Sequence, residues 1–532
     1  MNFQTLSVFV ECSTGCVPKI AYLKQFASLI AKMGYNAMYL GTSDTLQVEG
    51  EPYFGYLRGG YSQEEIHELD DYCKGIGMEL RPALQTLAKF HRLGAYEAYH
   101  GYMDIGDILL VGEEKVYDLL DKIFATCAKF YTSRTIHIGM DEAFLLGVGA
   151  YMAKHGLVSK QKIMLEHIQR VAQIAKKYGF QCEMWSDMFF RALNGDTGSA
   201  YESGVVDPAT ILQGLPDNVT IVYWDYVTNN LQACEKKIEQ HLSITDRVAF
   251  TGAIWKFMGF APDNRFSISV ADTAIEACKN KGIQHFQISL WADTHGECSL
   301  YSVLPSLFYY AEKAQGKAEI DRQKYFEIVG CDYDLLLKTD ELNDPHKKRY
   351  TTLNNKSFYY LYQDVLLGEF DSMLSEGIGD AYQRLAEEFL PLTQGAYGYV
   401  FATLQSLAEC LAVKAELGKN VWNAYKAGDK QRIQSLANDI DRLLISLDAL
   451  SKNFTAQWEN ENKSFGFEIH LIRLGGLQAR LRYVQEKLRK FANGEMAKIE
   501  ELEIERQPFG KLRSAKEDDF MYTGWNTIVS VN

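Results

Sequence analysis

The sequence contains no uninterrupted apolar run long enough to cross a bilayer, although 47% of its 532 residues are hydrophobic. Residues 1–20 show no basic segment followed by an apolar core, so no secretory signal peptide is expected. Cations are also scarce, because 55 Lys and Arg stand against 69 Asp and Glu and give a net charge of −14. A nucleic-acid groove needs clustered cations, so the net negative charge argues against a nucleic-acid partner. The lack of a long apolar run and of a signal segment argues against a membrane partner and favours a cytoplasmic protein.

The ten cysteines form no recognisable framework. They are scattered, and several fall inside apparent strands and helices, namely Cys73, Cys127, Cys182 and Cys278. Cys12 and Cys16 are the only close pair, and no histidine or second cysteine pair nearby completes a zinc site. We therefore expect buried thiols in a reducing cytoplasm, no metal and no other cofactor.

Strand-forming and helix-forming stretches alternate over residues 1–315. Short apolar, β-branched or aromatic runs separated by longer amphipathic stretches are typical of parallel strands covered on both faces. Eight such runs in succession favour a closed (β/α)8 barrel, and no Gly-rich phosphate loop follows the first run, which disfavours a dinucleotide-binding fold. We predict the barrel over residues 1–317, with strands at 6–11, 36–42, 78–85, 134–141, 181–187, 219–226, 248–255 and 285–292.

The pattern of apolar and polar residues changes after residue 317. Helical apolar spacing, few strand formers and almost no proline predict a helical C-terminal domain over 318–532, with helices at 356–376, 380–417, 420–450 and 467–494. These helices could serve a homodimer or supply a residue to a neighbour's site. The last stretch, 516–532, could return to the barrel or bridge subunits, and the sequence leaves these options open.

Two adjacent acids, Asp141 and Glu142, end the fourth predicted strand, where the catalytic groups of such barrels lie. Successive side chains of a regular strand point to opposite faces, so both acids can reach the barrel mouth only if the pleat breaks there. Two carboxylates held close together push their pKa values apart, which provides one protonated acid and one ionised partner. An Asp-Glu pair usually marks a solvated turn, so its surroundings decide the interpretation.

Aromatic residues occur at four other strand ends. Core packing explains any single tryptophan, but several at one mouth indicate walls for a sugar ring, whose C–H faces stack on aromatic rings. The residues concerned are Trp185, the run Tyr223-Trp224-Asp225, Trp255 and Trp291, with Asp187, Asp225, Asp293 and Glu297 beside them.

Together these residues resemble glycoside hydrolase family 20, the β-N-acetylhexosaminidases. The motif His-x-Gly-x-Asp-Glu at 137–142 is that family's signature, and Tyr223-x-Asp225, Trp255 and Trp291 match the family further along the chain. Three segments, EPYFGYLRG, YWDY and LPSLFYYAE, resemble the family's non-secreted bacterial branch, which has a helical C-terminal region. The resemblance covers roughly residues 1–315, which is consistent with one barrel.

The resemblance implies a retaining, exo-acting hydrolysis in which the substrate's own 2-acetamido group is the nucleophile. Glu142 would protonate the glycosidic oxygen and later act as base toward water, and Asp141 would orient the acetamide. Tyr223 would hydrogen-bond the acetamide oxygen, and His137 would tune the acid pair, although a core histidine explains it equally well. The other implied substrate-binding residues are Trp185, Trp255, Trp291 and Asp225. The implied partner is a glycan or glycoconjugate with a terminal N-acetylhexosamine.

Three positions depart from the family pattern. Thr14 stands where the first strand usually brings an arginine that grips sugar hydroxyls, and Lys89 stands where the branch has a histidine. Asp293 replaces the usual eighth-strand glutamate, with Glu297 as a substitute. We expect these departures to affect only the sugar's far edge and not the acid pair, so that the preferred sugar is altered or decorated. Arg58 or Lys89 would supply the missing cation for an anionic substituent.

Two alternative functions remain open. Another acetamide-assisted barrel, of the chitinase type, would use the same chemistry, but its acids are typically spaced Asp-x-Asp-x-Glu, and residues 137–142 contain only the terminal pair. A non-catalytic sugar-binding protein could also retain the barrel. Thr14 supports this second alternative, whereas the presence of both Asp141 and Glu142 argues against it.

Overall fold

The structure, a computed structural model, describes residues 3–194, 201, 208–293, 296–347, 353 and 355–507. The stretch 516–532, for which two positions are predicted, lies outside them. The chain forms two compact units. The barrel unit comprises Met1–Ile254, Ser267–Trp291 and Leu307–Asp321, and the helical unit comprises Trp255–Phe266, Ala292–Ser306 and Arg322–Asn532. The segments 255–266 and 292–306, which the sequence assigns to the barrel, thus belong to the helical unit.

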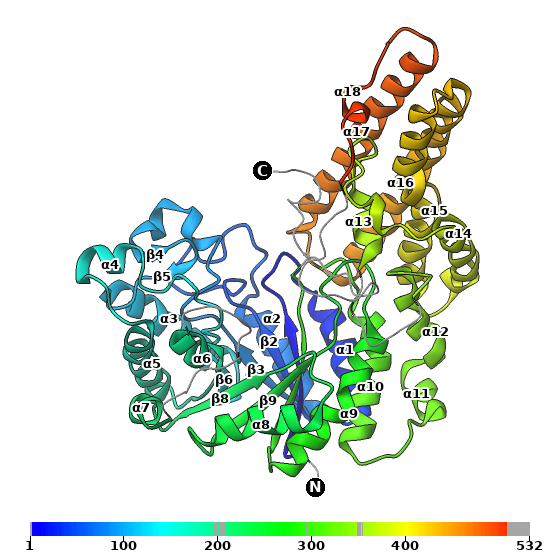
Figure 1. The fold of residues 1–532 in the computed structure, drawn as a ribbon. Coiled ribbons are helices and arrows are strands. Elements are labelled where there is room, and N and C mark those ends of the chain that lie inside the picture. Colours follow the sequence, from blue (N-terminus) through cyan, green and yellow to red (C-terminus); the bar gives the residue numbers. More distant parts are fainter. Residues whose placement is uncertain are drawn as a thin grey trace. The chain divides into compact units, whose positions relative to one another are not determined.

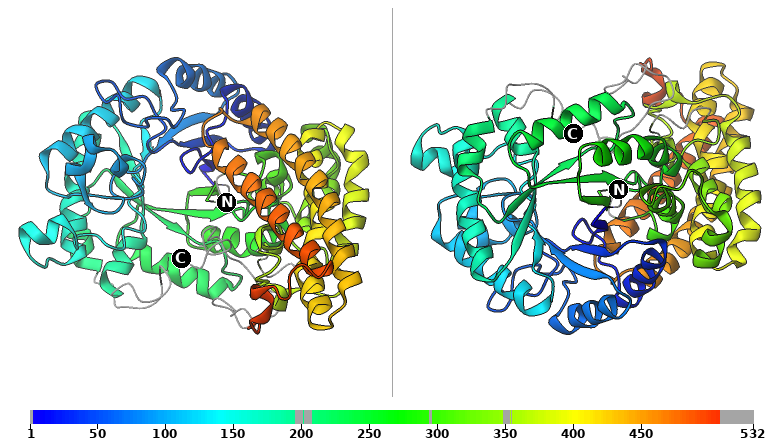
Figure 2. Two further views of the ribbon diagram at one scale, coloured as in Figure 1. Left: turned by 90° about the horizontal axis from the view of Figure 1, so that it is seen from above. Right: turned by 90° about the horizontal axis from the view of Figure 1, so that it is seen from below.

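Eight parallel strands close into a barrel, which confirms the predicted (β/α)8 fold (Figures 1 and 2). Neighbouring strands pair in the order β1-β10-β9-β8-β7-β6-β3-β2, and every predicted strand is present. Figure 2 shows helices of this unit outside the ring of strands, as apolar parallel strands require. The strands are β1 Thr5–Glu11, β2 Ala37–Gly41, β3 Glu79–Ala83, β6 Thr135–His137, β7 Gln181–Trp185, β8 Val219–Trp224, β9 Val248–Ala253 and β10 His285–Leu290.

Side chains that point inward from successive strands fill the barrel. All six residues of β9 are buried, because alternate side chains face the interior and the outer helices. Strand β6 pairs with β3 only at His137 and Ala83, whereas all three of its residues pair with β7. The interior cluster consists of Phe9, Tyr39, Ala83, Trp185, Val222 and Ala249.

The helices of the barrel unit show the expected terminal chemistry. Ser62 Oγ accepts from the Glu65 N–H while the Glu65 carboxylate accepts from the Ser62 N–H, and this capping box begins α2. Helix α1 ends at Gly34, whose φ of 111° suits glycine. The helices are α1 Ile20–Met33, α2 Gln63–Gly75, α3 Glu114–Phe130, α4 Ala150–His155, α5 Lys160–Lys177, α6 Asp187–Asn194, α7 Pro208–Gly214 and α8 Leu231–Leu242; α9 Asn264–Asn280 and α10 Leu304–Ala314 begin in the helical unit. A short hairpin, β4 Met103–Ile105 and β5 Ile108–Leu109, lies in the loop after β3.

The helical unit contains helices where the sequence predicts them, but some of the predicted helix ends differ from those in the structure. The predicted helix 356–376 stops early, because the Asp364 carboxylate accepts two backbone N–H groups and forms a turn. Pro391 lies in the break between α14 and α15, and Gly428, with φ of 67°, lies between α15 and α16. The helices are α11 Arg322–Val329, α12 Tyr333–Leu337, α13 Lys356–Tyr362, α14 Ile378–Phe389, α15 Gly398–Lys426, α16 Lys430–Glu461, α17 Phe467–Ala492 and α18 Glu500–Glu503.

All ten cysteines lie among the described residues and are free thiols, nine of them buried, as the sequence predicted. Burial raises the pKa of Cys73 to about 12, which disfavours the reactive thiolate. In the part of the chain that the structure describes, no helix combines the length and apolarity that crossing a membrane requires.

Candidate active site

The acid pair follows strand β6 after the regular pleat has ended. Gly139, Met140 and Glu142 adopt left-handed backbone, with φ of 68°, 72° and 55°. This break lets the Asp141 and Glu142 carboxylates both reach Lys89, as expected from the sequence if the pleat ends before two adjacent acids. A non-glycine residue in this conformation costs on the order of 1 kcal/mol, so the surrounding contacts must hold it.

A side-chain amide from the loop after β3 fixes this turn. Gln85 Oε1 accepts from the Met140 N–H at 3.2 Å, and Gln85 Nε2 donates to Asp141 Oδ1 at 2.9 Å. A Cβ atom on Gly139 would lie 2.2 Å from Gln85 Oε1, so only glycine leaves room for the amide. Gln85 therefore positions both the backbone and one carboxylate of the pair.

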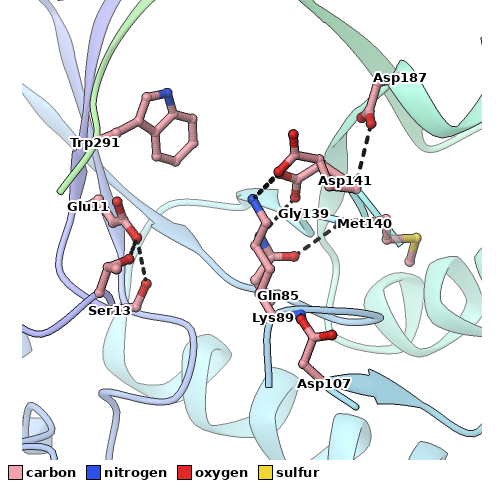
Figure 3. Close-up of polar contacts among 12 residues, drawn as sticks. Glu11, Ser13, Gln85, Lys89, Asp107, Gly139, Met140, Asp141, Asp187 and Trp291 are labelled. Carbon is pink, nitrogen blue, oxygen red and sulfur yellow. Dashed lines mark hydrogen bonds and ion pairs between the residues drawn. The ribbon is translucent and has the colours of Figure 1, made fainter. Parts of the chain in front are cut away.

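The Lys89 ammonium pairs with both acids. Figure 3 shows it beside Asp141. Its Nζ donates to Asp141 Oδ2 and lies 3.5 Å from Glu142 Oε2. Lys89 has a left-handed φ of 67°, and its N–H donates to Asp107 Oδ2 at 2.8 Å. The prediction that Lys89 affects only the sugar's far edge is therefore wrong, because its side chain lies on the two acids.

Asp141 and Glu142 differ in their surroundings. Burial opposes the ionisation of Asp141, but the Lys89 charge and hydrogen bonds from Lys89 and Gln85 outweigh it and hold the pKa below its usual value. The Glu142 side chain, in contrast, is 39% exposed. Unequal environments of two neighbouring carboxylates are what separate acid and base roles in hydrolytic sites.

A third carboxyl group, Asp187, lies beside the pair and was not among the predicted site residues. Asp187 is fully buried (Figure 3), and its Oδ2 accepts hydrogen bonds from the Glu142 N–H and from Arg191 Nε, each at 3.2 Å. Burial and the charges of Asp141 and Glu142 raise its pKa to about 7. The sequence signal for it is only its place at a strand end, two residues after Trp185.

Two of the predicted tryptophans lie together at the barrel interior. The ring centroids of Trp185 and Trp291 are 5.7 Å apart, and Phe9 lies 5.0 Å from Trp291. Trp291 Nε1 donates to the Tyr226 hydroxyl at 3.1 Å. Burial raises the pKa of Tyr226 well above its usual value, and the Asp141 charge adds to this, so the hydroxyl keeps its proton.

The predicted contact of Tyr223 with an acetamide is wrong. Val222 belongs to the interior cluster, so the alternating pleat of β8 turns Tyr223 to the outer side. There its ring centroid lies 4.8 Å from that of His241, and its hydroxyl donates to Asp225 Oδ2 at 2.5 Å. Asp225 Oδ1 also accepts from the Val227 and Thr228 N–H groups, so in this structure the Asp225 carboxylate caps the following turn. The tyrosine near the acid pair is Tyr226.

His137 lies under the turn that carries the acids. Its ring centroid is 4.1 Å from that of Trp185, and the Gly139 N–H donates to its Nδ1 at 3.1 Å. Burial lowers its pKa to about 4, so the ring is neutral. These contacts fit the core alternative left open by the sequence, in which His137 supports the site through packing and backbone contact.

Arg58, the other predicted cation, is hydrogen-bonded to the loop after β1. Its Nη2 donates to the Ser13 carbonyl oxygen and lies 3.2 Å from Asp44 Oδ1. Of the two cations considered from the sequence, Lys89 contacts the acids and Arg58 contacts this loop.

Glu11, at the end of β1, is a site residue that the sequence did not single out. Ser13 Oγ donates to Glu11 Oε1 at 3.2 Å, and Thr14 Oγ1 donates to the same oxygen. Figure 3 shows Glu11 and Trp291 on one side of the site and Lys89 on the other. Thr14, in place of the family arginine, thus orients a carboxylate that can accept hydrogen bonds from hydroxyl groups.

Three predicted site residues belong to the helical unit. Trp255 is buried and stacks on Phe257 with ring centroids 4.7 Å apart, and Asp293 is exposed. Glu297 is fully buried, and Arg473 Nη1 donates to its Oε1 at 3.1 Å. An internal ion pair therefore takes the place of the predicted sugar contact of Glu297.

Within the described ranges, no group of three or more His, Cys, Asp or Glu side chains is arranged to hold a metal ion. The site instead brings together a buried carboxylate held ionised, a partly exposed carboxylate and aromatic walls. This combination suits proton transfer to and from a substrate that presents an apolar face.

Two family models match the chain. One, described as "Glycosyl hydrolase family 20, catalytic domain", matches residues 55–246, and the other, described as "Glycoside Hydrolase 20C C-terminal domain", matches residues 332–521. The chain belongs to glycoside hydrolase family 20. The first match includes the acid pair, and the second covers most of the helical unit of this family 20 chain. The predicted membership of a family of glycoside hydrolases is confirmed.

Solved structures also match this family 20 chain. The exo β-N-acetylglucosaminidase from Vibrio harveyi in complex with N-acetylglucosamine is 12% identical with a TM-score of 0.45, over 63% of this chain and 58% of that chain. The β-N-acetylhexosaminidase from Bacteroides fragilis is 15% identical with a TM-score of 0.46, over 61% of this chain and 69% of that chain. No curated protein sequence matches the chain.

Proposed function

We propose that this family 20 chain is an exo-acting, retaining β-N-acetylhexosaminidase that releases a terminal N-acetylhexosamine by substrate-assisted hydrolysis. The observation that carries the proposal is the unequal burial of two adjacent carboxylates, Asp141 and Glu142. In such a reaction one acid stays ionised while the other exchanges a proton with the glycosidic oxygen. Asp141, whose pKa is held low, suits the first role, and the partly exposed Glu142 suits the second.

The substrate supplies the nucleophile. Its acetamide oxygen attacks the anomeric carbon as the glycosidic bond breaks, and Glu142 gives its proton to the departing oxygen. The resulting oxazolinium ion carries positive charge on the acetamide nitrogen, which the Asp141 carboxylate stabilises. Water then attacks the anomeric carbon and gives a proton to Glu142, which restores the acid, while the bond from that carbon to the acetamide oxygen breaks and regenerates the acetamide. Two successive displacements at one carbon retain its configuration.

Side chains around the acid pair suit a sugar ring. Trp185 and Trp291 offer ring faces for its C–H groups. The Tyr226 hydroxyl accepts from Trp291 and keeps its own proton, so it can donate to the acetamide oxygen in the role first assigned to Tyr223. Glu11 can accept from sugar hydroxyls, and each such bond to a charged group contributes about 1.5–3 kcal/mol.

The contact of Lys89 with Asp141 affects which sugar can react. Its ammonium occupies Asp141 Oδ2, and it would repel the positive charge that develops on the acetamide nitrogen beside the same carboxylate. Lys89 must therefore turn away when the reaction begins. A sulfate or phosphate on the sugar would offer it a charged partner, whereas a plain hydroxyl offers a neutral one. The proposal accordingly includes a preference for a decorated N-acetylhexosamine.

The test is a screen of β-linked N-acetylhexosaminides, plain, sulfated and phosphorylated, with the wild type and Glu142→Gln. We expect the wild type to release the N-acetylhexosamine with retained configuration, and the variant to bind substrate without turnover. Turnover of no substrate, or a fully active variant, would overturn the proposal; binding without turnover would favour a sugar-binding protein. Ordinary enzyme efficiency on a plain aryl β-N-acetylglucosaminide would remove only the preference for a decorated sugar.

A further inference from the structure

Two apolar side chains stand exposed directly after the acid pair. Phe144 and Leu145 are 42% and 52% exposed, and they follow Glu142 by two and three residues. A single exposed apolar residue is common on protein surfaces and needs no explanation. This pair differs from such residues because the segment that carries it is held from several sides.

Contacts on the side of the acids fix Phe144. Its N–H donates to the Glu142 carbonyl oxygen at 2.8 Å, and Lys160 Nζ donates to the Phe144 carbonyl oxygen at 2.5 Å. The guanidinium carbon of Arg191 lies 4.8 Å from the centroid of the Phe144 ring, within the range of a cation–π contact. Arg191 is in turn bound to Asp187, so one face of the ring rests on a fixed cation.

The β4–β5 hairpin holds the other end of the segment. Asp104 on β4 accepts from the Gly147 N–H at 2.8 Å and from the Tyr151 N–H at 2.7 Å. A Cβ atom on Gly149 would lie 2.2 Å from the Asp104 carbonyl oxygen, so the two backbones approach as closely as only glycine allows. Figure 1 shows α4, which begins here, beside β4 and β5. The exposed pair thus belongs to a loop that hydrogen bonds hold at both ends.

We propose that Phe144 and Leu145 form the binding surface for the leaving-group sugar, the ring on the far side of the bond that is cleaved. This inference rests on the proposed function, in which Glu142 delivers its proton to the oxygen that joins the two sugars. The departing sugar must then lie on the exposed side of Glu142, and Phe144 and Leu145 are the exposed apolar side chains that follow Glu142 directly in the same loop. The apolar C–H face of a pyranose stacks on an aromatic ring, so the surface takes a carbohydrate leaving group.

The first experiment compares leaving groups. Phe144→Ala and the conservative Phe144→Tyr are assayed on a β-linked N-acetylhexosaminyl disaccharide and on the corresponding methyl glycoside, which has no second ring. We expect Phe144→Ala to lower kcat/KM about tenfold for the disaccharide only, and Phe144→Tyr to retain it. Leu157→Ala, at a residue 87% exposed just beyond α4, is the matched control and should change neither substrate. Equal losses on both substrates, or none on either, would overturn the proposal.

The second experiment measures binding without turnover. In the Glu142→Gln background, calorimetry should show that the disaccharide binds about tenfold more tightly than free N-acetylglucosamine, and that adding Phe144→Ala removes the difference. Equal affinities before that substitution would overturn the leaving-group surface. If the wild type cleaves nothing while this difference in affinity is present, the proposed reaction fails and the sugar surface stands.

Discussion

Replacing Lys89 by methionine removes the ammonium from the acid pair and keeps the length of the apolar stem. A charge-assisted hydrogen bond contributes about 1.5–3 kcal/mol when shielded from water, and the 37% exposure of this side chain reduces that to about 1.4 kcal/mol. Because this contact must break before the acetamide N–H can use Asp141, its loss should raise kcat/KM on a plain aryl β-N-acetylhexosaminide about tenfold. On a sulfated or phosphorylated sugar this gain should be offset, since the anion loses its charged partner in the same variant, so the preference for the anionic sugar should fall about tenfold.

Steady-state kinetics on the plain and the anionic substrate measure this change of preference as a ratio of kcat/KM values. Lys154→Met on α4 is the control, because it makes the same change of charge at a residue that pairs with the surface residue Glu113. That control should leave the ratio unchanged. A similar loss of activity on every substrate in Lys89→Met would refute the reasoning, since Lys89 would then support the chemistry itself and not the choice of sugar.

Three further predictions follow from named contacts. Tyr226→Phe should lower kcat roughly tenfold, as expected when a hydrogen bond to a charged reacting group is lost, whereas Tyr223→Phe should leave kcat nearly unchanged in the same assay. Because the fold raises the pKa of Asp187 from 3.8 to about 7, stability that is present below pH 4 should be lost as the pH rises through 7; Asp187→Asn should flatten this dependence, measured as urea midpoints at pH 5 and pH 8. Glu297→Gln removes the carboxylate charge that pairs with the buried Arg473 and should cost about 3–5 kcal/mol in the free energy of unfolding, measured by chemical denaturation, with part of the loss recovered when Arg473→Met is added.

The barrel could be predicted because the same strand pattern occurs eight times along the chain. Each buried parallel strand reads as a short apolar run, and eight runs separated by amphipathic stretches leave few alternatives to closure. The limits of the elements could not be predicted as well. Strand β6 ends at His137, four residues before its predicted end, because Gly139 and Met140 take left-handed conformations. Nothing in the sequence indicates such a conformation for a methionine.

The candidate site could be predicted where a sequence motif determines the local geometry. It could not be predicted where the folded strands and loops determine which way a side chain points. Asp141 and Glu142 could be selected from their place at a strand end. The error at Tyr223 arose because its side of β8 depends on the pleat, which places the neighbouring Val222 in the interior. The tyrosine whose hydroxyl accepts a hydrogen bond from Trp291 is Tyr226. Lys89 could be identified as a departure, but only the folded loop shows that its ammonium reaches the acids.

The hydrogen bonds from Asp104 to the loop after β6 have a consequence for how this protein can be altered. The β4–β5 hairpin carries none of the reacting groups, yet it sets the position of the segment directly beyond Glu142. Loop exchange between relatives therefore has to transfer the hairpin and the acid loop together, because a hybrid would separate Asp104 from Gly147 and Tyr151. A change in the hairpin's length offers a way to remodel the surface beside Glu142 while the acid pair itself keeps its sequence.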